Sequence, residues 1–366
     1  MIPVNEPLLN GNEKKYLNEC IDTGWISSEG PFIKKFEEEF AKKSQKKYAV
    51  AVCNGTAALE IAIEALDIKE GDEVIMPAFT IISCASAIIK AGATPVLVDS
   101  DIETWNMNVQ EIEAKITSKT KAIMVVHIYG LPVDMNPLLA IAKKHNLKII
   151  EDAAEAHGQT YYGKPCGSFG DVSVFSFYPN KLITTGEGGM VLTDNEQVAE
   201  RLRSLRNLCF TAHKRFVHEE LGWNMRMTNL QAAVGVAQLE RWDDSIKRKR
   251  EIGKLYTELL KDVNGISLPV VKTDYADNIY WVFGILSKHK PAHVIMKQLG
   301  EKGIGTRPFF YPMHLQPILK KIGLYHNESY PNAEKMYNYG FYLPSGLALT
   351  DAQIHEVATI LKEVLN

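Results

Sequence analysis

The sequence predicts an α/β fold, with a mostly parallel mixed sheet covered by helices and a smaller α+β domain after it. From about residue 32 to residue 240, short apolar runs alternate with helical patterns, as in βαβ units. The chain has 366 residues, whereas a single core usually stops growing near about 250–300 residues. We therefore expect a large domain over residues 1–240, including an N-terminal segment 1–31, and a small domain over residues 241–366.

The strands predicted for the large domain are short and mostly rich in β-branched residues, as buried strands are. They cover residues 48–52, 73–76, 95–98, 122–127, 148–150, 172–177 and 190–192. Helical spacing predicts helices over residues 56–66 and 137–145. Asn54 is placed to cap the first of these helices, and Gly71 follows it in a turn.

The second part of the chain begins within a long helical pattern. This pattern runs from Asn229 to about Leu260, and its charged second half suggests a connector, so we place the domain boundary near Arg241. After it the sequence predicts a strand over residues 279–286, a helix over 292–302, a turn at 303–305 and a final helix from Asp351. These elements indicate a small α+β domain.

Composition excludes several classes of function. Hydrophobic residues make up 46% and charged residues 23% of the chain, which is typical of a globular enzyme. A net charge of −3 gives no reason to expect nucleic acid as a partner. The five cysteines form no Cys-x-x-Cys pair, so neither disulfides nor a metal site is indicated. The N-terminus lacks the pattern of a secretion signal and no run is apolar enough to span a membrane, so we expect a cytoplasmic protein.

A lysine-bearing loop is the first candidate for chemistry. Residues 172–177 form an aromatic strand that leads into Lys181, and the glycines of residues 186–189 follow. A single lysine is ordinarily a solvated surface residue. Here the amine sits among hydroxyls and glycines, where desolvation can lower its pKa and make it a nucleophile that forms Schiff bases.

Carboxylates at the end of the strand over residues 148–150 are the second candidate. Ligands of parallel sheets bind at such strand ends. Asp152 can hold a pyridinium nitrogen protonated, as an aspartate does in enzymes that use pyridoxal 5′-phosphate (PLP). Asp152 and Glu155 also have the spacing of a helix capping box. Spacing alone leaves both interpretations open.

The third candidate is the turn over residues 53–56, between a strand and a helix. The free backbone N–H groups at a helix N-terminus, together with the helix dipole, can hold a phosphate. The turn matches neither a Walker loop nor the glycine fingerprint of dinucleotide-binding folds. Taken alone, it is more often only a turn.

Together these stretches resemble the DegT/DnrJ/EryC1/StrS family of sugar-nucleotide aminotransferases, which are PLP enzymes of fold type I. The resemblance covers nearly the whole chain. The matching motifs are Trp25-Ile26-Ser27-Ser28, residues 54–59, 71–75, 127–130 and 151–155, Phe175-Ser176-Phe177 with Lys181, and residues 185–189 and 224–229.

The resemblance implies a role for each cofactor contact. Lys181 would form the Schiff base with PLP, Asp152 would pair with the pyridine nitrogen, and Glu155 would lie beside the ring. The phosphate would be held by Gly55, Thr56 and Ser176. Asn224 would reach the same site from the other subunit, which makes the protein a homodimer with shared active sites. Where many members of the family place an aromatic residue over the ring, this chain has Ile81.

The resemblance also implies the reaction. Relatives with histidine at the lysine position are dehydratases, so Lys181 favours transamination. L-glutamate would convert PLP to pyridoxamine phosphate, and a nucleotide-linked keto-sugar would then receive the amine. Residues 305–314 are similar to those of members that aminate C4 of GDP-4-keto-6-deoxymannose; dTDP-4-keto-6-deoxyglucose is the alternative substrate. The substrate contacts that we expect are Trp25, Arg226, Arg307, Tyr311 and His314.

Two of these contacts have structural alternatives, because Arg307-Pro308 can simply fix a loop and a lone histidine such as His314 is more often structural. A further alternative concerns the whole protein, which could be a PLP-binding regulatory protein of the same fold without catalytic activity. Amino transfer from L-glutamate distinguishes an enzyme from such a regulator.

Overall fold

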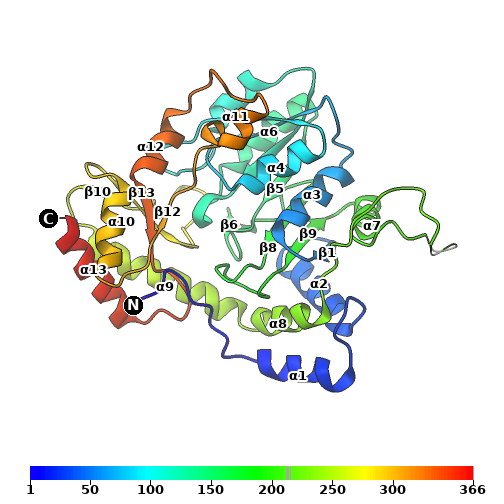
Figure 1. The fold of residues 1–366 in the computed structure, drawn as a ribbon, viewed down its shortest axis with the longest axis horizontal. Coiled ribbons are helices and arrows are strands. Elements are labelled where there is room, and N and C mark those ends of the chain that lie inside the picture. Colours follow the sequence, from blue (N-terminus) through cyan, green and yellow to red (C-terminus); the bar gives the residue numbers. More distant parts are fainter. Residues whose placement is uncertain (212–213, 215, 366) are drawn as a thin grey trace.

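The structure is a computed structural model that describes residues 1–211, 214 and 216–365. A seven-stranded sheet with the order β1-β9-β8-β5-β4-β2-β3 forms its centre (Figure 1). The strands are β1 (Tyr48–Val52), β2 (Glu73–Pro77), β3 (Thr94–Val98), β4 (Thr120–Val126), β5 (Lys148–Asp152), β8 (Val172–Ser176) and β9 (Gly189–Thr193). All of them lie where the sequence predicts strands, with ends that differ by at most two residues.

This sheet is mixed and mostly parallel, as predicted. β2 pairs in parallel with β3 and β4, and β5 pairs in parallel with β4 and β8. β9 is antiparallel to both of its neighbours, β1 and β8. Because β4, β5 and β8 are parallel, their carboxyl ends meet at one edge of the sheet, where ligands of such folds bind.

Helices cover both faces of the sheet, and successive strand residues point to opposite faces. On β8, Val174 packs with α3 and α4, whereas Phe175 packs on the other face with α2 and α8. The helices of this part are α1 (Glu13–Thr23), α2 (Pro31–Lys43), α3 (Gly55–Ala65), α4 (Ile82–Lys90), α5 (Val109–Ile112), α6 (Met135–His145), α7 (Glu196–Leu205), α8 (Asn229–Leu239) and α9 (Trp242–Leu260), with the 3-10 turns η1 (Glu113–Lys115) and η2 (Ile128–Gly130) and the hairpin of β6 (Thr160–Tyr161) and β7 (Lys164–Pro165).

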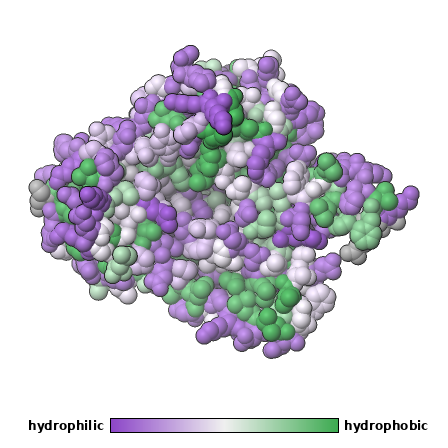
Figure 2. All heavy atoms as spheres, viewed as in Figure 1, coloured by the Kyte–Doolittle hydropathy of each residue, from purple (hydrophilic) through white to green (hydrophobic). Residues whose placement is uncertain are grey.

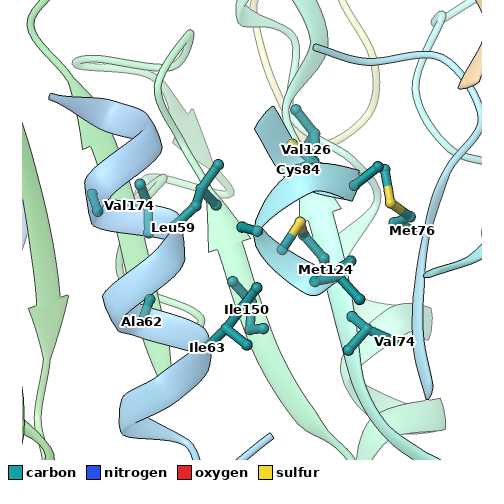
Figure 3. Packing of buried hydrophobic residues seen from close by; sticks show 14 of the residues in the cluster. Leu59, Ala62, Ile63, Val74, Met76, Cys84, Met124, Val126, Ile150 and Val174 are labelled. Carbon is teal, nitrogen blue, oxygen red and sulfur yellow. The ribbon is translucent and has the colours of Figure 1, made fainter. Parts of the chain in front are cut away.

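The core beneath α3 and α4 fixes the helix that begins at the 53–56 turn. Figure 3 shows Leu59 and Ile63 of α3 lying over Ile150 and Val174 of the sheet. These side chains are almost completely buried. Removing a buried leucine or isoleucine side chain from such a core costs about 2–5 kcal/mol. The N-terminus of α3 is therefore held rigidly at the carboxyl edge of the sheet.

A second, antiparallel sheet has the order β10-β11-β13-β12. Its strands are β10 (Ile266–Ser267), β11 (Phe283–Ser287), β12 (Arg307–Pro308) and β13 (Gly340–Leu343), and its helices are α10 (Ala292–Glu301), α11 (Pro317–Lys321), α12 (Pro331–Tyr339) and α13 (Asp351–Leu365), with the turn η3 (Met313–Leu315). Ile2 joins the core of this sheet and pairs with Ile304. The first residues of the chain thus contact the C-terminal part, which the assignment of segment 1–31 to the large domain does not anticipate.

Two predicted elements are wrong in detail. The helix expected from Asn229 to about Leu260 is two helices, because Arg241 has φ −107° and ψ 17° and lets Trp242 pack against Phe40. The strand expected over residues 279–286 begins only at Phe283. Before it, Tyr280 has a positive φ of 55° and donates its N–H to the Asn278 side chain at 2.7 Å, so this segment is a turn.

Within the described ranges, no helix is long and apolar enough to cross a membrane. The same residues contain no group of histidine, cysteine and acidic side chains arranged to hold a metal ion.

Candidate active site

A cavity of about 1060 Å³ opens at the carboxyl edge of the large sheet. Val126, Asp152 and Ser176, at the ends of β4, β5 and β8, form its floor. The start of α3 forms one wall, and residues 307–311 with Tyr342 form the wall from the C-terminal part. The cavity therefore lies between the two sheets, at the edge that the strand directions predict.

Lys181 points into this cavity from the loop after β8. Its side chain is only 11% exposed, and Nζ lies 3.8 Å from Oε1 of Glu155. Nζ also lies 3.9 Å from the centroid of the Trp281 ring. A backbone hydrogen bond from the N–H of Lys181 to the Tyr178 carbonyl, at 2.9 Å, closes the turn that carries the lysine. The interpretation of Lys181 as a solvated surface residue is therefore wrong.

Burial shifts the pKa values of this amine and its carboxylate neighbours toward one another. Burial lowers the pKa of Lys181, although the charges of Glu155 and Asp152 oppose the shift. Burial raises the pKa of Glu155 to about 7, against the effect of the Lys181 charge. These opposite shifts bring the two groups closer in acidity, which suits proton transfer between positioned side chains.

Asp152 is the last residue of β5, and each of its carboxylate oxygens accepts one hydrogen bond. Oδ1 accepts from the Ala154 N–H at 3.0 Å, and Oδ2 accepts from the Cys84 thiol at 3.4 Å. Burial raises the pKa of Asp152, and the Lys181 charge partly offsets this. A cationic group bound in the cavity would offset the remaining cost of burying the negative charge of Asp152.

The capping-box interpretation of Asp152 and Glu155 is wrong. No helix begins here; residues 153–159 form successive turns, in which Ala156 and Gln159 donate their N–H groups to the carbonyls of Ala153 and Ala156. Glu155 instead accepts the backbone N–H of Tyr129 at 2.8 Å. Both carboxylates therefore belong to the cavity rather than to a helix end.

The turn at the start of α3 offers hydrogen-bond donors to the cavity. The Asn54 side chain caps the helix, as predicted, by accepting the Ala57 N–H at 2.8 Å. The N–H groups of Gly55 and Thr56 have no acceptor within the helix, because they belong to its first turn. A Cβ atom on Gly55 would lie 2.7 Å from Cβ of Ser176. Only glycine lets β8 approach this helix end so closely.

Hydroxyl groups surround the same turn. The Thr56 and Ser83 hydroxyls are 2.9 Å apart, and both residues line the cavity with Ser176. A helix N-terminus with neighbouring hydroxyls suits a phosphate group. With the carboxylate of Asp152 for a ring nitrogen and the amine of Lys181 for an aldehyde, the residues present fit PLP.

The expected substrate residues divide into two groups. Arg307 and Tyr311 line the cavity, whereas Trp25, Asn224, Arg226 and His314 do not. His314 is buried outside the cavity lining and its Nε2 pairs with Glu334 at 2.9 Å, which favours the structural alternative. His314 lies in η3, and its ring centroid is 5.0 Å from that of Tyr330, the residue before α12.

Trp25, Asn224 and Arg226 lie outside the cavity of their own chain. Trp25 is 49% exposed. Nε of Arg226 donates to the Asn224 side chain at 2.9 Å. Ile81, at the position where the resemblance leads us to expect an aromatic residue, lines the cavity and is 43% exposed.

The sequence patterns did not identify Ser83, Cys84 or Trp281 as site residues. Ser83 and Cys84 lie on α4 with helical apolar spacing, which indicates a core helix and hides their polar contacts. Trp281 lies 100 residues from the lysine in the chain and belongs to a run that resembles a strand. No local signal could have placed it against Lys181.

An α/β fold with a lysine amine, two carboxylates and a helix N-terminus around one cavity fits the class of PLP-dependent enzymes. More narrowly, the chain belongs to the DegT/DnrJ/EryC1/StrS aminotransferase family, whose model matches residues 7–362. It is thus a PLP-dependent sugar aminotransferase, and the predicted fold type, enzyme class and cofactor are confirmed.

Three relatives illustrate the similarity. The GDP-perosamine synthase of Escherichia coli O157:H7 is 45% identical and covers 99% of this chain and 98% of its own. The dTDP-3-amino-3,6-dideoxy-alpha-D-galactopyranose transaminase of Aneurinibacillus thermoaerophilus is 41% identical over 93% of this chain and 92% of its own. The candidate sugar aminotransferase Spr1654 of Streptococcus pneumoniae, solved in its PMP form, has a TM-score of 0.94 and 27% identity and covers 100% of this chain and 97% of its own.

Proposed function

We propose that this aminotransferase moves the amino group of L-glutamate to C4 of GDP-4-keto-6-deoxymannose and forms GDP-perosamine. The observation that carries the reaction is the Lys181 amine beside the carboxylates of Asp152 and Glu155. The 45% identity to a GDP-perosamine synthase along nearly the full length of both chains supports the sugar. A dTDP-linked keto-sugar is the second candidate, because the relative from A. thermoaerophilus is a dTDP-sugar transaminase.

When bound, PLP supplies an electron sink that stabilises negative charge on a substrate carbon. Asp152 would keep the pyridine nitrogen protonated, which strengthens that sink. The N–H groups of Gly55 and Thr56 would hold the phosphate together with the hydroxyls of Thr56, Ser83 and Ser176. These residues would hold opposite ends of the cofactor in the cavity that Lys181 also lines.

Lys181 would carry the proton in each half of the reaction. In the first half its Nζ would take the proton from the α-carbon of glutamate. In the second half it would return a proton to C4 of the sugar. The lowered pKa of Lys181 favours this role, because it increases the share of neutral amine that can take up a proton. Arg307 and Tyr311, on the opposite wall, would contact the sugar nucleotide, since a guanidinium suits phosphate oxygens.

We also propose that the active enzyme is a homodimer with shared sites. Hydrophobic side chains gather over α1 and α8 and over the segment that follows α7 (Figure 2). The exposed ones include Ile21, Trp25, Ile26, Leu221 and Trp223. Exposed apolar patches mark protein interfaces. Asn224 and Arg226 lie in this region, so a second subunit that covers it would bring them toward another cavity.

The mass of the product tests the proposal. The purified protein is incubated with PLP, L-glutamate and either GDP-4-keto-6-deoxymannose or dTDP-4-keto-6-deoxyglucose. We expect the mass of a 4-amino sugar from the GDP substrate, and glutamate alone should change the visible absorbance of bound PLP to that of pyridoxamine phosphate. Product from the dTDP substrate alone would overturn the choice of GDP.

Substitution of the lysine tests the assigned chemistry. Lys181→Ala should lower amino transfer by roughly a thousandfold, because it removes the group that carries the proton. The exposed Lys119→Ala is the matched control and should retain full activity. Full activity in Lys181→Ala would refute the role of this lysine.

A further inference from the structure

The ring of Trp281 lies against the active-site lysine, although no step of the proposed reaction uses it. Trp281 is in the turn before β11, is 5% exposed and lines the cavity. Its ring centroid is 3.9 Å from Nζ of Lys181, within the range of a cation–π contact. The amine thus lies between the face of an indole and the carboxylate of Glu155.

A hydrogen bond ties the same indole to the lysine loop. Nε1 of Trp281 donates to the carbonyl of Asn180 at 2.8 Å, directly before Lys181 in the chain. One side chain from the C-terminal part therefore contacts both the amine of Lys181 and the backbone that carries it. A tryptophan that served only to fill the core would need neither the contact with the Lys181 amine nor the hydrogen bond to Asn180.

A buried lysine on α9 fixes the backbone of Trp281. Nζ of Lys249 donates to the Trp281 carbonyl at 2.7 Å and also to the carbonyl of Ser345, which lines the cavity. Lys249 is 2% exposed. Its two acceptors lie on segments flanking the second sheet, so Trp281 is held from behind as well as through its indole.

We propose that Trp281 is a positioning residue for Lys181, whose ring holds the amine as an ammonium group when it is not bonded to the cofactor and whose indole N–H fixes the lysine loop. This inference rests on the acid–base role proposed for Lys181. It adds a group from the C-terminal part of the same chain to the machinery of the large sheet.

Other titratable groups also act on this amine, and the test has to separate them from the ring. The charges of Asp152, Glu155 and Cys84 favour the protonated form of Lys181. The positive charge of Lys181 in turn disfavours protonation of His157. Lys249 lines a small neighbouring pocket with His157 and Trp281. None of these groups is changed by a substitution at position 281, so a shift there reports the indole.

The pH dependence of Lys181 labelling tests the ring contact. The full-length protein without cofactor is treated with a trace amine-acylating reagent between pH 6 and 11, and the Lys181 peptide is quantified by mass spectrometry. Trp281→Leu should move the midpoint of labelling down by about half a pH unit, since a cation–π contact is worth about 0.5–2 kcal/mol. Trp281→Phe keeps an aromatic face and should show a smaller shift.

Kinetics of the PLP-loaded enzyme test the loop contact. Trp281→Leu should lower kcat about tenfold and Trp281→Phe about threefold, because both lose the hydrogen bond to Asn180, while KM for the sugar nucleotide changes less than twofold. Trp242→Phe, another buried tryptophan outside the cavity, is the control and should leave both the labelling midpoint and kcat unchanged.

An unchanged or raised midpoint in a folded Trp281→Leu protein would overturn the inference. If that variant does not fold, Trp281→Phe decides, and wild-type labelling together with wild-type kcat would overturn the inference in the same way. Labelling requires no turnover, so it remains informative even if the proposed sugar substrate is wrong. Failure of the proposed function would appear instead as missing product in the wild-type enzyme.

Discussion

At the scale of single residues, His157 shows how the core beside the lysine keeps an ionisable group neutral. Aromatic rings surround its imidazole, among them Phe40, Phe175 and Trp242. Its Nδ1 accepts the Ile183 N–H at 3.4 Å. Burial, together with a smaller effect of the Lys181 charge, lowers the pKa of His157 to about 3. The native state therefore binds no proton here above that pH.

This neutral histidine should make the protein sensitive to acid. In the unfolded chain its pKa is near 6.5, so the unfolded state binds a proton as the pH falls from about 6.5 to 3 and the native state does not. Stability is then lost as the pH falls, by about 2 kcal/mol at pH 5. His157→Phe should remove this part of the loss, which urea denaturation at pH 7 and pH 5 would measure.

The control for this prediction is His293→Gln, which replaces an exposed histidine of α10. It should leave the difference in unfolding free energy between the two pH values as in the wild type. If the His157→Phe protein showed the same difference in unfolding free energy between pH 7 and pH 5 as the wild type, another group would cause the acid sensitivity.

At the scale of elements, the start of α3 serves both stability and cofactor binding. Asn54 caps this helix at the edge of the cavity, and Asn195 caps α7 in the same way by accepting the Val198 N–H at 3.2 Å. The cavity does not include Asn195. The two asparagines therefore have the same local role in different surroundings.

Asn54→Ala and Asn195→Ala should each lower the free energy of unfolding by about 1 kcal/mol, the usual cost of a lost cap. Only Asn54→Ala should also weaken PLP binding, because it loosens the N–H groups that would hold the phosphate. Thermal unfolding and fluorescence titration of PLP measure the two effects. Equal PLP affinity in both variants would contradict phosphate binding at this turn.

At the scale of the whole molecule, the apolar face over α1 and α8 leads to a prediction about subunits. If Lys181 and Asn224 of different chains form one site, inactive Lys181→Ala and Asn224→Leu proteins should complement each other when they are mixed and reassociated. Half of the dimers are then mixed, each with one intact site, so about a quarter of wild-type activity should return. An activity assay of the mixture measures this.

The control mixture combines Lys181→Ala with Asp152→Asn. Both residues lie in one cavity of one chain, so every site of a mixed dimer carries one defect and no activity should return. Recovery in neither mixture would argue against shared sites.

The sequence by itself determined the strands of the large sheet, the cap of α3, and the positions of Lys181 after β8 and of Asp152 at the end of β5. Such features depend on local periodicity and on turn residues, and a stretch of a few residues is enough to identify them. It also carried the family motifs, and through them the cofactor and the reaction class that the comparisons confirm.

Only the tertiary structure decided the contacts between distant segments. It set Trp281 against Lys181, paired His314 with Glu334 outside the cavity lining, and divided the helical pattern after Asn229. These outcomes depend on which buried surfaces meet when the second sheet packs against the first. Periodicity along the chain records that a side chain is buried, but not which distant side chain it will touch.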